Sequence, residues 1–149
     1  LKAFSEKFGV QVYLEPGEAA ITNSTSLEVT VLDILNNGKD LAIVDSSIEA
    51  HMLDLLIYRE QAKLPQSGTH EYQVCGKSCL AGDIFGDARF ERPLSVGDRI
   101  SVADAAGYTM VKKNWFNGVA MPSIVIRDLD GSLRLVREFG YEDYASSLS

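Results

Sequence analysis

The chain has 149 residues, of which 46% are hydrophobic, and its 14 basic and 21 acidic side chains give a formal net charge of −7. This length is typical of one domain, or of one domain with a piece of another, and the apolar share is sufficient for a buried core. The acidic balance argues against a nucleic-acid partner, because no excess of cations is available to neutralise phosphates. No apolar run reaches the ~20 residues of a membrane-spanning helix. We therefore expect neither nucleic acid nor membrane as a partner.

The first 20 residues have the pattern of an α/β unit. Apolar side chains recur at helical spacing over 1–8, and Gly9 follows as a helix stop. Residues 10–14 are typical of a strand, and an acidic turn follows at 15–18. One such unit cannot stand alone, and the chain begins with Leu1 rather than Met, so we expect a piece of a longer protein.

From about residue 22 the pattern changes to short strands separated by turns. The Asn-Asn-Gly sequence at 36–38 and Asp-Gly at 130–131 are strong hairpin signals. Residues 45–70 are less regular. The expected elements are strands at 27–34, 41–44, 71–75, 98–103, 123–127 and 132–137, and a short helix at 141–148. This succession predicts a mainly β domain, a barrel or a sandwich.

The cysteines Cys75 and Cys79 and the histidines His51 and His70 do not have metal-ligand spacing. Structural zinc sites usually combine two close ligand pairs, and the chain has only one. A single disulfide across so short a loop would also be a poor staple. We therefore predict no metal and a reducing, cytoplasmic location.

Three short blocks differ from ordinary strand or turn sequence: Glu-Pro-Gly-Glu at 15–18, Cys-Leu-Ala-Gly-Asp at 79–83 and Asp-Ala-Ala-Gly-Tyr-Thr at 104–109. The first follows a strand, where α/β barrels carry their active sites. The second could hold a thiol in a cleft, and the third would let the backbone approach a ligand beside the Tyr108 hydroxyl. Taken singly, each is more typical of a solvated turn, a packed cysteine or a tyrosine at the core edge.

Together and in order, these blocks resemble the signature blocks of the alanine-racemase-fold, pyridoxal-phosphate-dependent decarboxylases. That group includes the diaminopimelate, ornithine and arginine decarboxylases. Within it, the sequences at 14–19, 50–52, 79–83 and 108–113 are most similar to the carboxynorspermidine decarboxylases. The resemblance covers essentially the whole chain.

The resemblance implies a division of the chain into two parts. Residues 1–20 would be the last helix and strand of a TIM-like (β/α)8 barrel that binds pyridoxal 5'-phosphate. Residues 21–149 would be the β-rich C-terminal barrel or sandwich domain of a fold type III enzyme. The family's Schiff-base lysine lies near the start of the barrel, and no lysine of this chain stands in its context. The chain alone is therefore expected to be inactive.

The resemblance also implies roles for individual residues. Glu15 matches the glutamate that keeps the cofactor's pyridine nitrogen protonated, Gly17 belongs to the same cofactor-binding block, and Tyr108 matches the tyrosine that hydrogen-bonds the cofactor phosphate. Cys79 matches the cysteine that enters the neighbouring subunit's site and helps deliver a proton to the substrate carbon. A site completed by a partner residue implies a two-fold homodimer with shared active sites.

The departures from the family's pattern concern the substrate. Glu18 and Asp54 stand where diaminopimelate decarboxylases carry arginines that hold the distal carboxylate, and Tyr58, one helical turn after Asp54, matches a tyrosine there. Leu80 replaces an acidic residue that contacts the distal amine in related enzymes. Reversed charge favours ammonium groups, so the resemblance implies that Glu18, Asp54 and Tyr58 bind the amine chain of carboxynorspermidine or carboxyspermidine. The products would be norspermidine or spermidine and CO2.

Other interpretations stay open at this point. Glu18 and Asp54 could be solvated acids on an acidic surface. The chain could also belong to a diaminopimelate decarboxylase-like enzyme, which the two acids disfavour, or to a catalytically dead homologue that binds amines or a protein. His51 is as consistent with a packed histidine as with a site residue, and Cys75 is expected to be packed.

Overall fold

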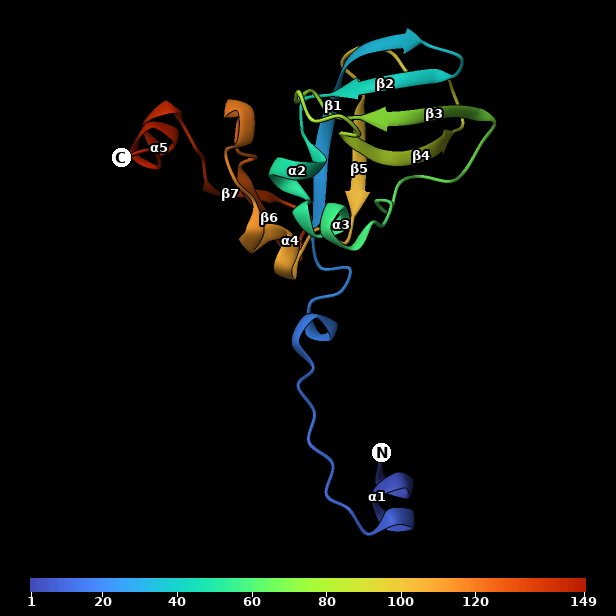
Figure 1. The fold of residues 1–149 in the computed structure, drawn as a ribbon, viewed down its shortest axis with the longest axis vertical. Coiled ribbons are helices and arrows are strands. Elements are labelled where there is room, and N and C mark those ends of the chain that lie inside the picture. Colours follow the sequence, from blue (N-terminus) through green and yellow to red (C-terminus); the bar gives the residue numbers. More distant parts are fainter.

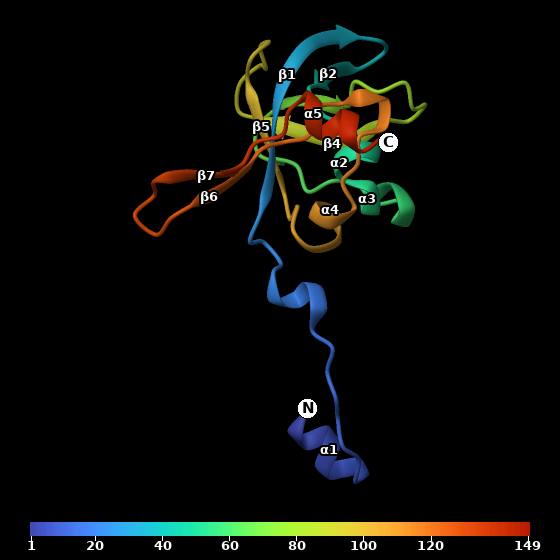
Figure 2. The same cartoon turned by 90° about the vertical axis from the view of Figure 1, so that its left-hand side faces the viewer.

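The computed structural model describes residues 1–149, which form an extended amino-terminal arm, a sheet domain and a carboxy-terminal hairpin with a helix (Figures 1 and 2). The helices of the structure are too short or too polar to span a bilayer. In chain order the elements are α1 (Lys2–Phe8), the 3-10 turn η1 (Gly17–Ala20), β1 (Ser26–Asn36), β2 (Asp40–Val44), α2 (Ile48–His51), α3 (Leu53–Tyr58), β3 (His70–Cys75), β4 (Ile84–Phe90), β5 (Arg99–Ala103), α4 (Gly107–Lys112), the 3-10 turn η2 (Phe116–Gly118), β6 (Ile124–Arg127), β7 (Leu133–Arg137) and α5 (Tyr141–Ser146).

The main sheet has five strands in the order β4-β3-β2-β1-β5. Only β2 and β3 pair in parallel, and the connection between them carries α2 and α3. The long strand β1 pairs with β5 through its first half, where Val29 lies opposite Ile100, and with β2 through its second half. A bulge between Val31 and Asp33 separates the halves, and such irregularities bend a strand. The strand β1 therefore joins the edge strand β5 to the other three strands of a curled sheet.

One face of the sheet is buried because its strands alternate between apolar and polar residues. In β1 the inward positions Leu27, Val29 and Val31 are buried and their neighbours are more exposed. Phe85 of β4 and Met52, just after α2, are the bulkiest fully buried side chains. Burial of a side chain of this size contributes about 1.5–3 kcal/mol. The core therefore fixes α2 against the sheet, and with it the start of α3.

The structure confirms the mainly β fold and most of the predicted elements. The predicted hairpins form as β1–β2 and β6–β7, and α1 ends at Gly9, whose φ of 61° lies in the left-handed region. Two kinds of element were missed. The strand β4 was not predicted, because Gly86 interrupts its apolar pattern. The helices α2, α3 and α4 have only four to six residues, too few for a helical period to be visible.

The strand predicted at 10–14 was wrong. These residues lie outside every helix and strand, and Val10, Tyr13 and Leu14 are exposed. A strand is stable only when a neighbour accepts and donates its backbone hydrogen bonds, and no other strand of this chain lies beside the arm (Figure 1). The alternating pattern predicted the conformation that the residues favour, while the absence of a neighbouring strand decided the outcome.

The carboxy-terminal helix is attached through aromatic contacts. The Trp115 ring lies 6.2 Å from the Phe139 ring and 5.7 Å from the Tyr144 ring, measured between ring centres. Distances of this size are typical of stabilising aromatic pairs. Trp115 is therefore a packing residue that connects α5 to the segment after α4.

A buried histidine lies at the end of α2. His51 is 4% exposed, its Nδ1 lies 2.8 Å from the Ser46 hydroxyl, and its Nε2 is buried without a hydrogen-bond partner. Burial, and secondarily the positive charge of Lys113, lowers the pKa of His51 to about 4. His51 is therefore a packed, neutral histidine at neutral pH.

This pKa predicts an acid-sensitive stability. Because the pKa of His51 is about 4 in the folded chain and 6.5 in the unfolded chain, the unfolded state binds more protons between these values. The corresponding stability is complete above about pH 6.5, and roughly 3 kcal/mol of it is lost as the pH falls to about 4. Urea unfolding between pH 4 and 7 measures the loss. A His51→Gln variant should lose this dependence and a His70→Gln control should keep it; an unchanged slope in His51→Gln would contradict the assignment.

Candidate active site

Two short helices, α3 and α4, pack against each other near the start of β1 (Figure 1). Each carries two functional side chains four residues apart: Asp54 and Tyr58 on α3, and Tyr108 and Lys112 on α4. Residues at this spacing lie on one face of a helix. The packing of the helices brings these four side chains together.

Lys112 is at the centre of this group. Its Nζ lies 2.5 Å from Asp54 Oδ1, 4.8 Å from the centre of the Tyr108 ring and 6.0 Å from the centre of the Tyr58 ring. The hydrogen bond with Asp54 raises the pKa of Lys112. Asp54 is only 8% exposed, and a buried carboxylate is costly unless a charged partner compensates it. The ion pair thus allows α3 to place an acid in the interior.

Glu18 lies at the opposite end of α4. A Cβ atom added to Gly107 would stand 3.4 Å from Glu18 Oε1 and 3.2 Å from the Ile21 side chain, so the turn η1 lies directly against the first residue of α4. Gly107 has a φ of +55°, which favours glycine at this close approach. Glu18 forms no ion pair within the chain, whereas Asp54 is paired with Lys112. Glu18 therefore carries the uncompensated negative charge of the group.

The loop between β3 and β4 is built around a buried aspartate. Asp83 is 5% exposed, and its carboxylate accepts hydrogen bonds from the Ile48 N–H at 2.8 Å, the Ser78 N–H at 2.9 Å and the Ser78 hydroxyl at 2.6 Å. A Cβ at Gly76 would lie 2.3 Å from the same carboxylate, so a larger residue does not fit there. Asp83 thus ties the loop to the start of α2 and fixes the backbone that carries Cys79.

The two cysteines have different surroundings. Cys79 is exposed, and its N–H donates to Asn117 Oδ1 at 2.9 Å. Asn117 has a φ of 56°, a conformation that asparagine adopts more readily than most residues. Cys75 is half-buried, and burial raises the pKa of its thiol. Cys79 is therefore the accessible thiol, held on a loop anchored at both ends.

The structure brings some of the sequence-predicted residues together and leaves others apart. Asp54, Tyr58 and Tyr108 form one cluster, with Glu18 against the same helix α4. Glu15 lies in the exposed arm just before η1, and Gly17 is the exposed first residue of η1. Cys79 contacts η2 instead of the cluster.

Lys112 is the residue that the sequence interpretation missed. It follows Tyr108 by four residues, as Tyr58 follows Asp54, and this equal spacing was the available signal. The signal was concealed because the short helices α3 and α4 were not predicted. Without them, the sequence does not indicate that Asp54 and Lys112 meet.

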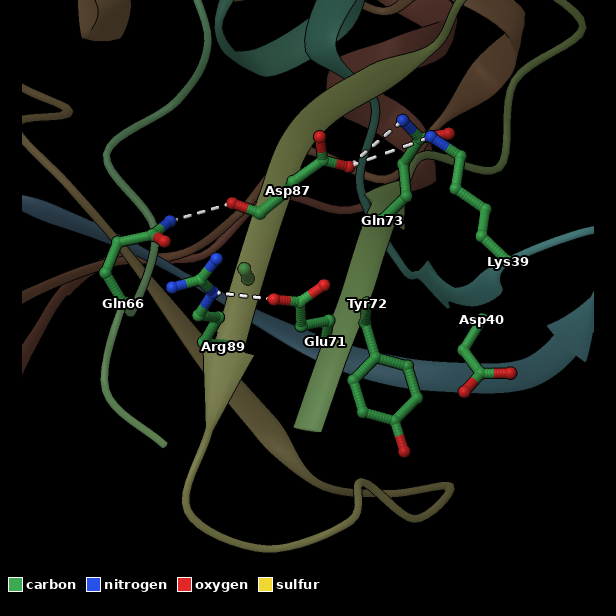
Figure 3. A pocket seen from close by; sticks show the side chains of 9 residues that line it. Lys39, Asp40, Gln66, Glu71, Tyr72, Gln73, Asp87 and Arg89 are labelled. Carbon is green, nitrogen blue, oxygen red and sulfur yellow. Dashed lines mark hydrogen bonds and ion pairs between the residues drawn. The ribbon is translucent and has the colours of Figure 1, made fainter. Parts of the chain in front are cut away.

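A hollow lies apart from this cluster, on the sheet over β2, β3 and β4 (Figure 3). Its charged groups pair with one another: Arg89 Nε lies 2.9 Å from Glu71 Oε1, and Lys39 Nζ lies 3.9 Å from Asp87 Oδ1. Gln73 donates to the same Asp87 carboxylate at 3.2 Å. Since these polar groups satisfy each other, the hollow does not compete with the α3–α4 cluster as a candidate site. No group of three or more histidine, cysteine or acidic side chains is placed to hold a metal ion.

Comparison with known proteins places the chain in a family. Residues 19–106 match the family described as pyridoxal-dependent decarboxylase, C-terminal sheet domain. The chain is 67% identical over its whole length to the carboxynorspermidine/carboxyspermidine decarboxylase of Herminiimonas arsenicoxydans, and it covers 41% of that protein. It is 42% identical over 93% of its length to the carboxyaminopropylagmatine decarboxylase of a Synechocystis species, with 38% of that protein covered.

A solved structure supports the same relation. The crystal structure of carboxynorspermidine decarboxylase from Campylobacter jejuni, complexed with norspermidine, superposes with a TM-score of 0.85 at 38% identity. The match covers 98% of this chain and 44% of that one. The chain thus spans about two fifths of the length of these curated relatives. It belongs to the pyridoxal-dependent decarboxylases and contains the C-terminal sheet domain of that family.

Proposed function

We propose that the chain is the C-terminal part of an enzyme that removes the α-carboxylate of carboxynorspermidine, and of carboxyspermidine, to give norspermidine or spermidine and CO2. The observation that carries the proposal is the placement of Glu18, Asp54, Tyr58 and Tyr108 around the single short helix α4. The 67% identity to a decarboxylase named for both polyamine acids supports it. In this proposal residues 1–20 complete a (β/α)8 barrel, residues 21–149 form the C-terminal domain, and the enzyme acts in the cytoplasm.

The residues present fit pyridoxal 5'-phosphate as the cofactor. The Glu15 carboxylate and the Tyr108 hydroxyl are both exposed and form no hydrogen bond within the chain. Each can therefore form a hydrogen bond with a ligand. Glu15 would accept a hydrogen bond from the protonated ring nitrogen, and the Tyr108 hydroxyl would donate one to the phosphate. The space beside Gly17 is open, since a Cβ there would meet nothing within 4 Å. When bound, the cofactor supplies an acceptor for the electron pair that remains as CO2 leaves.

The charges of the cluster favour a cationic substrate tail. Glu18 carries an uncompensated charge, and Asp54 pairs with Lys112 through Oδ1 alone, which leaves Oδ2 without a partner in the chain. Both can accept N–H groups from the amines of a polyamine acid, and Tyr58 offers a ring for cation–π contact. A substrate with a distal carboxylate would instead be repelled by Glu18.

Cys79 is the proposed proton donor. It is exposed and held by the hydrogen bond to Asn117, but it does not reach the α3–α4 cluster of its own chain. We place it in the site of a neighbouring subunit, which makes the functional unit a two-fold homodimer. There its thiol would deliver a proton to the substrate carbon from which CO2 departs.

The reaction is tested with the full-length protein, pyridoxal 5'-phosphate and three acids: carboxynorspermidine, carboxyspermidine and diaminopimelate. We expect CO2 from the two polyamine acids and at least 10-fold lower kcat/KM for diaminopimelate, because one misplaced charge is worth about 1.4 kcal/mol or more. The 149-residue chain by itself should release no CO2. A preference for diaminopimelate would overturn the proposal.

Charge reversal at Glu18 tests the substrate site. In Glu18→Arg we expect a KM for carboxynorspermidine about 10–100-fold higher, because a charged hydrogen bond is replaced by repulsion. The control is Glu91→Arg, the same change at an exposed position in the turn between β4 and β5. A KM in Glu18→Arg that equals the control's would show that Glu18 is a solvated acid.

Removal of the thiol tests the proton donor. In Cys79→Ala we expect kcat to fall by about 100-fold, as for loss of a general acid, with KM little changed. Cys75→Ala is the matched control, since this half-buried thiol takes no part in the proposed chemistry. Equal kcat values for the two variants would remove Cys79 from the mechanism.

A further inference from the structure

Lys112 connects the two helices that carry the proposed substrate-binding and cofactor-binding side chains. We infer that Lys112 is a positioning residue for substrate specificity: its ammonium group holds Asp54 in one orientation, so that Oδ2 faces the ligand as a directed acceptor. The inference rests on the proposed function in one respect, namely that the ligand of Asp54 is the amine chain of the substrate.

The first argument is the environment of Asp54. Its side chain is 11% exposed, whereas that of Lys112 is 34% exposed, so the lysine reaches from the surface to a carboxylate in the interior. Without Lys112, a carboxylate buried to this degree would have no charged partner and would move toward water. Such a movement would displace the acceptor that an ammonium group of the substrate needs. Lys112 therefore keeps Asp54 in place.

The second argument is the use of the two carboxylate oxygens. Lys112 occupies Oδ1, and Oδ2 makes no hydrogen bond within the chain. A carboxylate held through one oxygen has a fixed orientation, because rotation would break the 2.5 Å contact. The pair is neutral overall, so Asp54 contributes direction and Glu18 contributes net charge. Selectivity for the spacing of amines would then depend on Lys112.

The third argument is the pair of tyrosines around the ammonium group. The Nζ atom lies 4.8 Å from the ring centre of Tyr108 and 6.0 Å from that of Tyr58, both within the range of cation–π attraction. Tyr108 is on the same helix as Lys112, and Tyr58 on the same helix as Asp54. The lysine ammonium therefore contacts α3 twice, at Asp54 and Tyr58, and its own helix α4 once, at Tyr108. These contacts fix α4, with Tyr108, against α3.

The test uses the full-length enzyme with Lys112→Met, which keeps most of the aliphatic side chain and removes the charge, and Lys112→Arg, which keeps the charge. We expect Lys112→Met to raise the KM for carboxynorspermidine at least 10-fold with kcat changed less than threefold, and Lys112→Arg to stay within threefold of the wild-type KM. Lys113→Met is the matched control: it removes the adjacent positive charge, which lies 4.6 Å from the Phe139 ring and does not contact Asp54. Its KM should stay within twofold.

Coupling to Asp54 is the second measurement. The KM of a Lys112→Met/Asp54→Asn double variant should be no higher than that of the worse single variant. Both changes remove the same feature, the oriented carboxylate of Asp54. An unchanged KM in Lys112→Met, a Lys112→Arg variant no better than Lys112→Met, or multiplicative effects in the double variant would overturn the inference. If Lys112→Met does not fold, Lys112→Gln, which also removes the charge, takes its place in each of these comparisons.

Failure of the proposed function is distinguishable from failure of this inference. A wild-type enzyme that releases no CO2 from either polyamine acid overturns the function. The pairing is then judged by urea unfolding, in which Lys112→Met and Asp54→Asn should each lower the midpoint and the double variant should lower it no further. Additive shifts would show that Lys112 does not hold Asp54.

Discussion

The ion pair between Asp54 and Lys112 is the interaction on which the candidate site depends. A carboxylate that is 8% exposed must be compensated, and Lys112 does so from a helix that lies 58 residues further along the chain. The same contact joins α3 to α4, each too short to be stable alone in water. Charge compensation of Asp54 and the packing of the two helices thus depend on the same contact.

The sheet supplies the framework that makes this contact possible. Ile48 and Met52 at the two ends of α2 are buried in the core, so the start of α3 has a fixed position relative to the strands. Asp83 ties the loop of Cys79 to the same helix through the Ile48 N–H. The two parts of the proposed chemistry, the amine-binding cluster and the thiol, therefore share α2 as their common support although they face different places.

Most of the sheet could be predicted from the sequence because its signals are local. Alternation of apolar residues in β1 and the glycine turns specify strands and hairpins without reference to distant residues. The segment 10–14 shows the limit of such signals, since its strand pattern had no partner to pair with. The helices α2, α3 and α4 show another limit, because they are held by tertiary packing and have little periodicity of their own.

For the site, the residue types were evident in the sequence and their arrangement was not. Glu15, Glu18, Cys79 and Tyr108 were found through short blocks, and Asp54 through its alignment with an arginine of related enzymes. Lys112 was missed because only packing shows that its ammonium meets Asp54. By itself, the sequence determined the strand pattern, the acidic balance and the blocks that place the chain in its family. The tertiary structure alone decided which acid is compensated and which is free, because charges 58 residues apart interact only after the core has brought their helices together.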